Sequence, residues 1–186
     1  FEIQLRSIIF NVVSILTGTG YVTKEFDQWG NFPLIFFLLL MFIGGCAGST
    51  TCGIKVFRVH MLYFFLKNQL LKIIYPRAII NLKYNNDLVQ DKLIASIISF
   101  IYLYILIFFI ISALLTLTGL NFITAVSGAA SSISNVGPGL GNEIGPNSNY
   151  ANLPVASKWI LSAGMILGRL EIFAILVIFL PSFWRN

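Results

Sequence analysis

The stretch Thr17-Gly18-Thr19-Gly20-Tyr21 ends one short apolar segment, and the comparable stretch Asn135-Val136-Gly137-Pro138-Gly139 ends another far downstream. Backbone that leaves helical geometry at membrane depth must be buried in protein or line a wet cavity, because lipid cannot hydrogen-bond its amides. Loops of this kind line ion paths with carbonyl oxygens. The two stretches therefore predict selectivity-filter loops, with a re-entrant structural hairpin that binds no ion as the alternative. The predicted filter residues are Thr17, Gly18, Thr19, Gly20, Asn135, Val136, Gly137 and Pro138.

The composition indicates an integral membrane protein. Of the 186 residues, 57% are apolar and 10% are charged, whereas a soluble domain carries roughly 25% charged residues. The basic residues lie beside hydrophobic segments, so their excess is no sign of nucleic-acid binding. Cys46 and Cys52 have neither a CxxC spacing nor a His in the same loop. We therefore expect no metal or redox chemistry at these cysteines and no cofactor in the chain.

The segment before the first loop is predicted to be a short helix that ends at Thr17. Apolar residues recur in it at helical spacing, namely Ile3, Leu5, Ile8, Ile9, Val12, Val13 and Leu16. The helix is too short to span a bilayer, which takes about 20 apolar residues. Its negative dipole end would point towards the loop, and that end favours a cation.

The next helix is predicted to break in mid-membrane. Residues 33–43 are apolar over about half a span, and a stretch rich in glycine and hydroxyl groups follows. Each glycine costs a helix roughly 1 kcal/mol relative to Ala, so the break must face protein or water. The stretch lacks the Gly-Lys-[Ser/Thr] triplet of a phosphate-binding loop. We interpret it as a movable obstruction below the filter, with the gate residues Gly44, Gly45, Gly48, Ser49, Thr50, Thr51 and Gly53.

The connection 55–92 carries the positive charge of the chain. Its charged residues are Lys55, Arg58, Lys67, Lys72, Arg77, Lys83 and Lys92 against Asp87 and Asp91. Seven minus two is +5, which equals the net charge of the whole chain. The positive-inside rule then predicts a cytoplasmic connection, with both filter loops facing outside.

The second half begins with a continuous apolar run, 93–117, that is long enough to span a membrane. A short segment rich in small residues, 122–134, leads into the second filter loop, and a final apolar helix runs to Trp184. That helix holds Arg169 and Glu171, which at i,i+2 lie on nearly opposite faces and cannot pair. Arg169 would either face the pore and repel a bound ion or anchor the broken loop.

The order of elements repeats, which predicts two helix–pore loop–helix units in an all-α integral membrane fold. Residues 1–75 would form a unit without its first helix, 76–92 a cytoplasmic connection and 93–186 a complete unit. Matching residues 41–45 with 165–169 sets Arg169 opposite the start of the glycine-rich break. Two loops cannot close a ring of four, so the chain is expected to be part of a longer protein.

Four motifs in this order resemble the Trk/Ktr/HKT superfamily of cation transporters. They are the loop 17–21, the loop 44–55 that ends in Gly53-Ile54-Lys55, the loop 135–141 and the pair Gly168-Arg169. The resemblance covers essentially the whole chain as the last two of four repeats. It implies a pseudo-fourfold pore that binds K+ through backbone carbonyls, with Gly20 and Gly137 as the filter glycines. It also implies that the loop after residue 43 acts as a gate beside Arg169, which makes Arg169 a gate residue. Cys52 stands where relatives commonly have glycine.

The resemblance also implies partners and a location. It implies a homodimer in the bilayer of the inner cell membrane, the N-terminal repeats of the same protein, and a cytosolic nucleotide-binding regulatory ring. The leading hypothesis is potassium uptake through a gated filter, with K+ as the transported ion. A Na+-permeable member of the same superfamily is the rival. A membrane-embedded enzyme or a structural scaffold is the alternative from another class, and the opposed faces of Arg169 and Glu171 are a poor start for catalysis.

Overall fold

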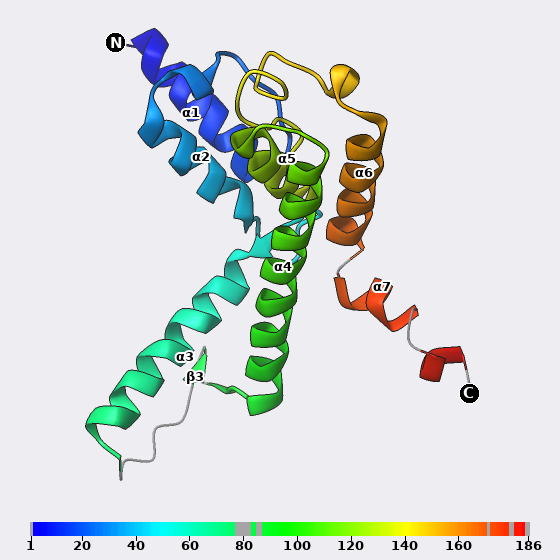
Figure 1. The fold of residues 1–186 in the computed structure, drawn as a ribbon. Helices are drawn as coiled ribbons and strands as arrows, with labels where there is room; N and C mark the ends of the chain where they lie inside the picture. Colours follow the sequence, from blue (N-terminus) through cyan, green and yellow to red (C-terminus); the bar gives the residue numbers. More distant parts are fainter. Residues whose placement is uncertain (1, 77–82, 85–86, 171, 179–180, 185–186) are drawn as a thin grey trace.

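The computed structural model describes residues 2–76, 83–84, 87–170, 172–178 and 181–184, and the chain is helical throughout most of this part (Figure 1). The helices are α1 (Glu2–Leu16), η1 (Phe26–Gln28), α2 (Asn31–Phe42), α3 (Val56–Ile74), α4 (Asp91–Leu117), α5 (Phe122–Ser134), η2 (Tyr150–Asn152), α6 (Val155–Arg169), α7 (Ile172–Ile178) and η3 (Pro181–Trp184). Two pairs of two-residue strands, β1 (Ile43–Gly44) with β2 (Ile54–Lys55) and β3 (Lys83–Tyr84) with β4 (Asp87–Leu88), complete it.

The two short helices α1 and α5 end where the sequence predicts. Both stop at a glycine-rich loop, and both lie at the same end of the molecule together with α2 (Figure 1). One apolar cluster joins the two units at this end. Its buried members are Ile15, Phe26, Phe37, Met41, Ala130, Val136 and Leu140. The loops that follow α1 and α5 are therefore held by a common core.

The long helix α4 packs against α5 and α6 through a second apolar cluster. On α4 the cluster buries one residue per turn, ending at Leu115, which is completely buried. On α5 it contains Ala125 and Ala129, also completely buried, and small residues at a helix interface let two backbones approach closely. The hydroxyl of Tyr104 on α4 bonds the hydroxyl of Ser134 at 2.7 Å, which ties the end of α5 to α4.

The helices α5 and α6 touch backbone to backbone. Gly164 and Gly168 lie one turn apart on α6. A Cβ added to Gly168 would lie 1.8 Å from the carbonyl oxygen of Ile133, and one added to Gly164 would lie 2.8 Å from Oγ of Ser132. Asn135, the residue after α5, donates from Nδ2 to the carbonyl of Met165 at 3.0 Å. Only glycine fits at position 168.

Replacing Gly168 with Ala should therefore prevent stable folding. The added methyl group overlaps backbone, which cannot move aside as a side chain tip can, and overpacking costs about 3 kcal/mol or more in such a case. Gly48→Ala is the matched control, since a Cβ there meets no atom within 4 Å. The measurement is thermal unfolding of the purified proteins in detergent. Equal unfolding temperatures for the two variants would contradict this packing.

The segment between α2 and α3 is broken, as the sequence predicts. After Phe42, strand β1 pairs in parallel with β2, the strand that precedes α3. Ile43 pairs with Ile54 and Gly44 with Lys55. Residues 45–53 form the loop between the paired ends, which we call the gate loop. This parallel pair and the small antiparallel pair β3–β4 are features that the all-α prediction did not include.

The predicted final helix is not continuous. The run after Pro154 forms α6 and α7, separated at residues 170–171 and bent by 106°. Leu170 leaves helical geometry, with φ −92° and ψ 17°. Arg169 is therefore the last residue of α6 rather than a residue inside one long helix. Glu171 lies outside the described residues.

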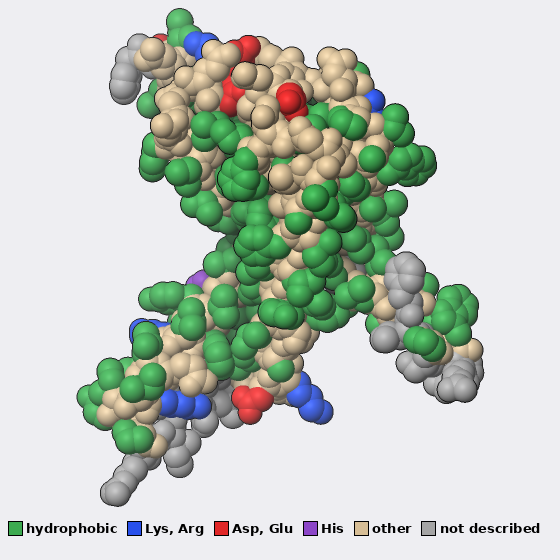
Figure 2. All heavy atoms as spheres, in the orientation of Figure 1, with side chains coloured by type: hydrophobic (Ala, Val, Ile, Leu, Met, Phe, Trp, Pro, Cys, Tyr) green, Lys and Arg blue, Asp and Glu red, His purple; other side chains and the backbone are tan. Residues whose placement is uncertain are grey.

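Within the described residues, α4 is long and apolar enough to cross a membrane alone, and α6 with α7 reaches that length only as a bent pair. The prediction of a spanning segment at 93–117 agrees with α4. In the space-filling view, hydrophobic side chains cover most of the middle of the molecule, and charged side chains lie towards its two ends (Figure 2). This distribution is the one expected of a protein embedded in lipid.

Candidate functional site

The two predicted filter loops lie against each other, although 116 residues separate Gly20 from Val136. A Cβ added to Gly20 would lie 2.2 Å from the carbonyl oxygen of Val136 and 3.1 Å from Cδ of Pro138. Gly20 has φ +72°, a conformation that glycine adopts without strain. The structure thus brings together the two stretches that the sequence singled out.

The backbone donors of the first loop turn back to α1. The N–H groups of residues 17, 18, 19 and 20 donate to carbonyls of Val13, Ile15 and Ser14, at 2.9–3.4 Å. The hydroxyls of Thr17 and Thr19 also donate to α1, at 2.8 Å to Val13 and 3.2 Å to Ser14. Because the N–H groups and threonine hydroxyls of the loop donate to α1, the carbonyl oxygens of the loop are the groups available to a ligand.

The second loop is built in the same way. Asn135 ends α5 in the left-handed conformation, with φ 52°, a position that Asn tolerates better than most residues. The N–H groups of Asn135 and Val136 donate to carbonyls of α5, and that of Gly137 donates to Oγ of Ser131 at 3.1 Å. The carbonyl of Gly137 accepts from the hydroxyl of Tyr150. Gly137, one of the four predicted filter residues of this loop, therefore has its carbonyl oxygen hydrogen-bonded to a residue outside the loop.

Polar side chains hold the segments that follow both loops. Asn11, fully buried on α1, accepts from the backbone N–H of Thr23 at 3.1 Å, which holds the chain after the first loop. Asn147 donates to the carboxylate of Glu25, a contact between the two units. Asp27 lies beside Gly145, and burial raises the pKa of its carboxyl above the usual value. The pKa of the Tyr150 hydroxyl is raised for the same reason, burial.

The gate loop is held in shape by its own hydroxyls and glycines. The N–H of Gly45 donates to Oγ1 of Thr51 at 2.8 Å, and that hydroxyl bonds Oγ of Ser49 at 2.5 Å. A Cβ on Gly44 would lie 2.4 Å from the carbonyl of Cys52, and Gly53 has φ +85°. Gly48 has open space around it. Gly44, Gly45 and Gly53 therefore lie in the closely packed base of the loop, and Gly48 lies at a tip with open space around it.

Arg169 contacts the gate loop directly. Its Nη1 donates to the carbonyl of Thr50 at 2.8 Å and reaches Sγ of Cys52 at 3.8 Å. The contact supports the anchoring alternative for this arginine. The repeat alignment set Arg169 opposite the start of the break, and its hydrogen bond goes to Thr50 in the later half of the loop.

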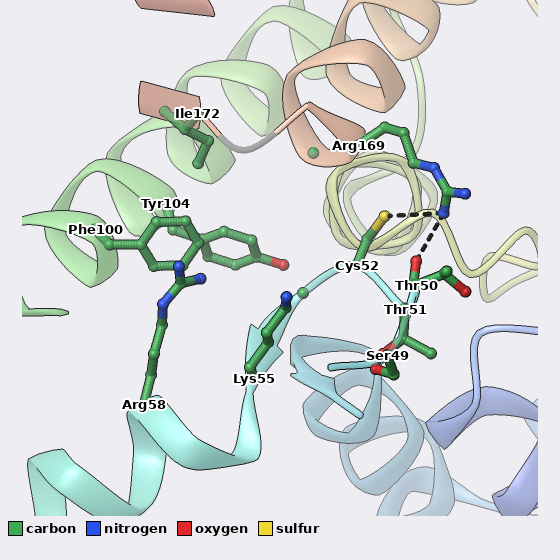
Figure 3. A pocket seen from close by; sticks show the side chains of 12 residues that line it. Ser49, Thr50, Thr51, Cys52, Lys55, Arg58, Phe100, Tyr104, Arg169 and Ile172 are labelled. Carbon is green, nitrogen blue, oxygen red and sulfur yellow. Dashed lines mark hydrogen bonds between the residues drawn. The ribbon is translucent and has the colours of Figure 1, made fainter. Parts of the chain in front are cut away.

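A half-open cavity of about 270 Å³ lies behind the gate loop (Figure 3). The gate loop forms one wall with Ser49 to Gly53, and α4 forms another with Phe100 and Tyr104. Three basic residues line it as well, Lys55, Arg58 and Arg169. The guanidinium of Arg58 stacks on the ring of Phe100 at 3.8 Å. Among the described lining residues there is no Asp or Glu.

Several of these residues were missed by sequence reasoning. Tyr150 holds the carbonyl of Gly137 but stands in a polar stretch that gave no sign of it. Arg58 was interpreted only as part of a cytoplasmic charge excess, and Lys55 as part of that excess and as the end of the motif 44–55, although both line the cavity. Their position immediately after the glycine-rich break was the signal available. In the described part of the chain no group of three His, Cys, Asp or Glu side chains is placed to hold a metal ion.

The fold and these loops define a class of helical membrane protein built on short helices that end at glycine loops. The family model of the TrkH cation transport proteins matches residues 2–185, and the chain belongs to this family. The predicted family is thereby confirmed, and it is a family of transporters rather than of enzymes.

Relatives with curated names point the same way. The chain is 42% identical over 183 residues to the Trk system potassium uptake protein TrkI of Halomonas elongata, and 34% identical over 182 residues to TrkH of Escherichia coli K12. Each alignment covers 98% of this chain and 37% of the relative. The chain thus spans little more than a third of the length of these relatives.

A solved structure has the same fold. The crystal structure of the potassium transporter TrkH from Vibrio parahaemolyticus superimposes with a TM-score of 0.87 at 34% identity, over 96% of this chain and 37% of that one. The all-α membrane fold predicted from the sequence is confirmed by this match.

Proposed function

We propose that the chain is the last two of four pore-loop repeats of a transporter that takes up potassium ions across the inner cell membrane. Residues 1–75 and 93–186 are the two repeats, and 76–92 connects them on the cytoplasmic side. The names of the relatives, all Trk potassium uptake proteins, support K+ as the transported ion. The N-terminal repeats of the same protein complete the ring of four loops.

The observation that carries the proposal is the contact between Gly20 and the carbonyl of Val136. Two glycine loops from different repeats meet there, each at the negative dipole end of a short helix. The donors of both loops turn back to their helices, so the backbone carbonyls of Thr17 to Gly20, Asn135 and Val136 are available to replace the water shell of a cation. Gly137 and Pro138 support this strand, with the Gly137 carbonyl bound to Tyr150.

The gate loop then closes the path below the filter. Its tip around Gly48 is unobstructed, while Gly44, Gly45 and Gly53 fix its base. Arg169 holds the later half through the carbonyl of Thr50. We propose that the loop moves aside when this contact breaks, that a cytosolic nucleotide-binding regulator acts on the cytoplasmic side, and that the transporter is a homodimer in the bilayer. The filter loops face outside.

Ion flux into proteoliposomes tests the proposal. The protein is the whole transporter that contains this chain, and uptake of K+, Rb+ and Na+ is measured separately. K+ and Rb+ should pass and Na+ should be excluded by about tenfold or more, the ratio that 1.4 kcal/mol of discrimination produces. Gly137→Ser is the paired variant: φ +109° lies outside the left-handed region, roughly +50° to +70°, that non-glycine residues can adopt, so a side chain there must shift the backbone of the loop although the space is open. It should admit Na+.

Two outcomes would contradict the proposal. Free passage of Na+ through the unmodified protein would favour the Na+-permeable alternative within the same superfamily. Unchanged selectivity in folded Gly137→Ser would mean that the loop 135–138 is a structural hairpin.

A further inference from the structure

We infer that Tyr150 is a specificity-determining residue of the transporter, because its hydroxyl fixes the orientation of one filter carbonyl, that of Gly137. This role rests on the proposed function, since it requires that the loop 135–138 select ions. It goes beyond that function by assigning part of the selection to a side chain outside both filter loops. Tyr150 acts through the Gly137 carbonyl rather than on the ion itself, so it is a positioning residue.

The peptide groups of Gly137 are held on both sides by hydroxyls. Its N–H donates to Oγ of Ser131 at 3.1 Å, and its carbonyl accepts from the hydroxyl of Tyr150. Ser131 is a buried residue of α5, and its side chain also hydrogen-bonds the Tyr150 hydroxyl. The three residues therefore form one network, and the carbonyl of Gly137 cannot turn without breaking a bond in it.

The peptide between Gly137 and Pro138 has few other groups that could fix its orientation. Proline has no N–H, so the Gly137 carbonyl is the one hydrogen-bonding group of this peptide. Gly137 has φ +109°, and a Cβ there would meet no described atom within 4 Å. Neither a side chain nor close packing at this glycine restrains the backbone. The direction of the carbonyl is therefore set by the bond from Tyr150.

The preceding carbonyl of the loop, that of Val136, is placed in another way. The N–H of Val136 donates to the carbonyl of Ser131 at 3.1 Å, which fixes the strand to α5. The carbonyl oxygen of Val136 lies at the contact with Gly20 of the first loop. Two successive carbonyls thus have different neighbours, the first loop for Val136 and Tyr150 for Gly137. Loss of the Tyr150 hydroxyl would free the second carbonyl and leave the contact between the loops in place.

Tyr150 is itself fixed, which makes its hydroxyl a preorganised donor. It begins the short helix η2, where Asn149 accepts from the N–H of Ala151 at 3.0 Å. Lys158 of α6 donates to the carbonyl of Ala151 at 2.6 Å, and Leu153 after η2 is buried in the apolar cluster of α4, α5 and α6. A side chain that is already ordered loses little rotamer entropy when it bonds a carbonyl. Burial raises the pKa of the Tyr150 hydroxyl above its usual value, so the hydroxyl stays a neutral donor at neutral pH.

The bond affects both properties on which a carbonyl filter depends, the size of the ion cavity and the field of its oxygens. It keeps the Gly137 carbonyl from turning towards an ion smaller than K+, and it occupies one of the two lone pairs of the oxygen. Without the hydroxyl, the carbonyl is free to approach Na+ more closely. Loss of the bond should therefore lower selectivity while the path for K+ remains open.

Tyr150→Phe tests this role, because it keeps the ring and removes the hydroxyl alone. Uptake of K+ and of Na+ is measured in proteoliposomes that hold the whole transporter. The ratio of K+ to Na+ uptake should fall about fivefold, the factor by which a neutral hydrogen bond shifts an equilibrium. The maximal rate of K+ uptake should be retained. Tyr102→Phe is the control: it removes a tyrosine hydroxyl from an exposed position on α4 and should leave the ratio unchanged.

A double-mutant cycle with Ser131→Ala tests whether Tyr150 acts through Gly137. Ser131 holds the N–H of the same residue whose carbonyl Tyr150 holds. The two variants therefore act on one network, and their effects on the ratio of K+ to Na+ uptake should not simply multiply. Effects that multiply as independent changes would overturn the route through Gly137.

Ion binding without transport gives a second readout. In detergent, an ion that binds the folded protein raises the unfolding temperature according to its affinity. K+ should raise it more than Na+ at equal ionic strength, and this difference should shrink in Tyr150→Phe. The same difference in the variant and in the unmodified protein would contradict a role of Tyr150 in ion selection.

The outcomes separate this role from the proposed function. Free passage of Na+ through the unmodified protein contradicts the proposed function. A selective unmodified protein, together with a folded Tyr150→Phe variant of equal selectivity, overturns the role of Tyr150 alone. If Tyr150→Phe yields no folded protein, the hydroxyl serves the fold rather than ion selection, and the role is overturned as well.

Discussion

Gly20→Ala should abolish discrimination between K+ and Na+, whereas Gly18→Ala should not. Both glycines have nearly the same conformation, φ +72° and +68°, so both variants carry the strain of a left-handed alanine, about 1–2 kcal/mol. They differ in surroundings. The new methyl group lies 2.2 Å from the Val136 carbonyl oxygen in Gly20→Ala and meets nothing within 4 Å in Gly18→Ala.

The overlap in Gly20→Ala must push the Val136 carbonyl away from the neighbouring loop. A carbonyl ring that has lost its geometry loses its preference between ions, and each 1.4 kcal/mol lost lowers the ratio of K+ to Na+ flux tenfold. The measurement is flux of both ions in proteoliposomes, with thermal unfolding to show that the variants are folded. Equal loss of selectivity in the two variants would mean that backbone conformation, and not the contact between the loops, is what matters.

Arg169→Ala should raise the resting flux of K+. The variant removes the hydrogen bond from the guanidinium to the Thr50 carbonyl, and a bond to a charged group contributes about 1.5–3 kcal/mol. If the loop is closed by this contact, the population of open loops rises by roughly 10- to 150-fold. The flux at rest should rise in proportion until the path is open in most molecules.

Arg169→Lys distinguishes the two interpretations of this residue. If Arg169 acts by its positive charge on a nearby ion, lysine keeps the charge and restores the original flux. If it acts as an anchor, lysine offers a single point charge without the planar fork and restores the flux only in part. An unchanged K+ flux in Arg169→Ala would contradict both interpretations. Arg169 would then be a residue that lines the cavity without controlling the loop.

Local patterns were enough to predict the elements whose ends depend on nearby residues. The helices α1 and α5 stop where glycine or Asn135 takes up a left-handed conformation, and the residue types show this directly. The break between α2 and α3 was also predictable, because a run with four glycines cannot stay helical in lipid. The break after Arg169 was not, since the glycines of this run, Gly164 and Gly168, lie within α6 and neither glycine nor proline occurs in the sequence 169–172.

The individual motifs of the candidate site were predicted from the sequence, but the contacts between them were not. Each filter loop is visible as a motif, but the contact between Gly20 and Val136 depends on the shared core beneath them. The same holds for Arg169, whose partner Thr50 is 119 residues away. The alignment of repeats set Arg169 opposite the break, but which residue of the loop it binds depends on how α6 packs against that loop.

The glycine contact between α5 and α6 joins the predicted filter loop 135–138 to Arg169 through directly packed backbone. Gly168 touches the Ile133 carbonyl two residues before the filter strand begins, and the next residue, Arg169, holds the gate loop. In the proposed transporter, an ion in the filter and the state of the loop are then thermodynamically linked, and linkage is reciprocal. A regulator that opens the loop should shift the apparent affinity for external K+, and external K+ should shift the affinity for the regulator by the same factor.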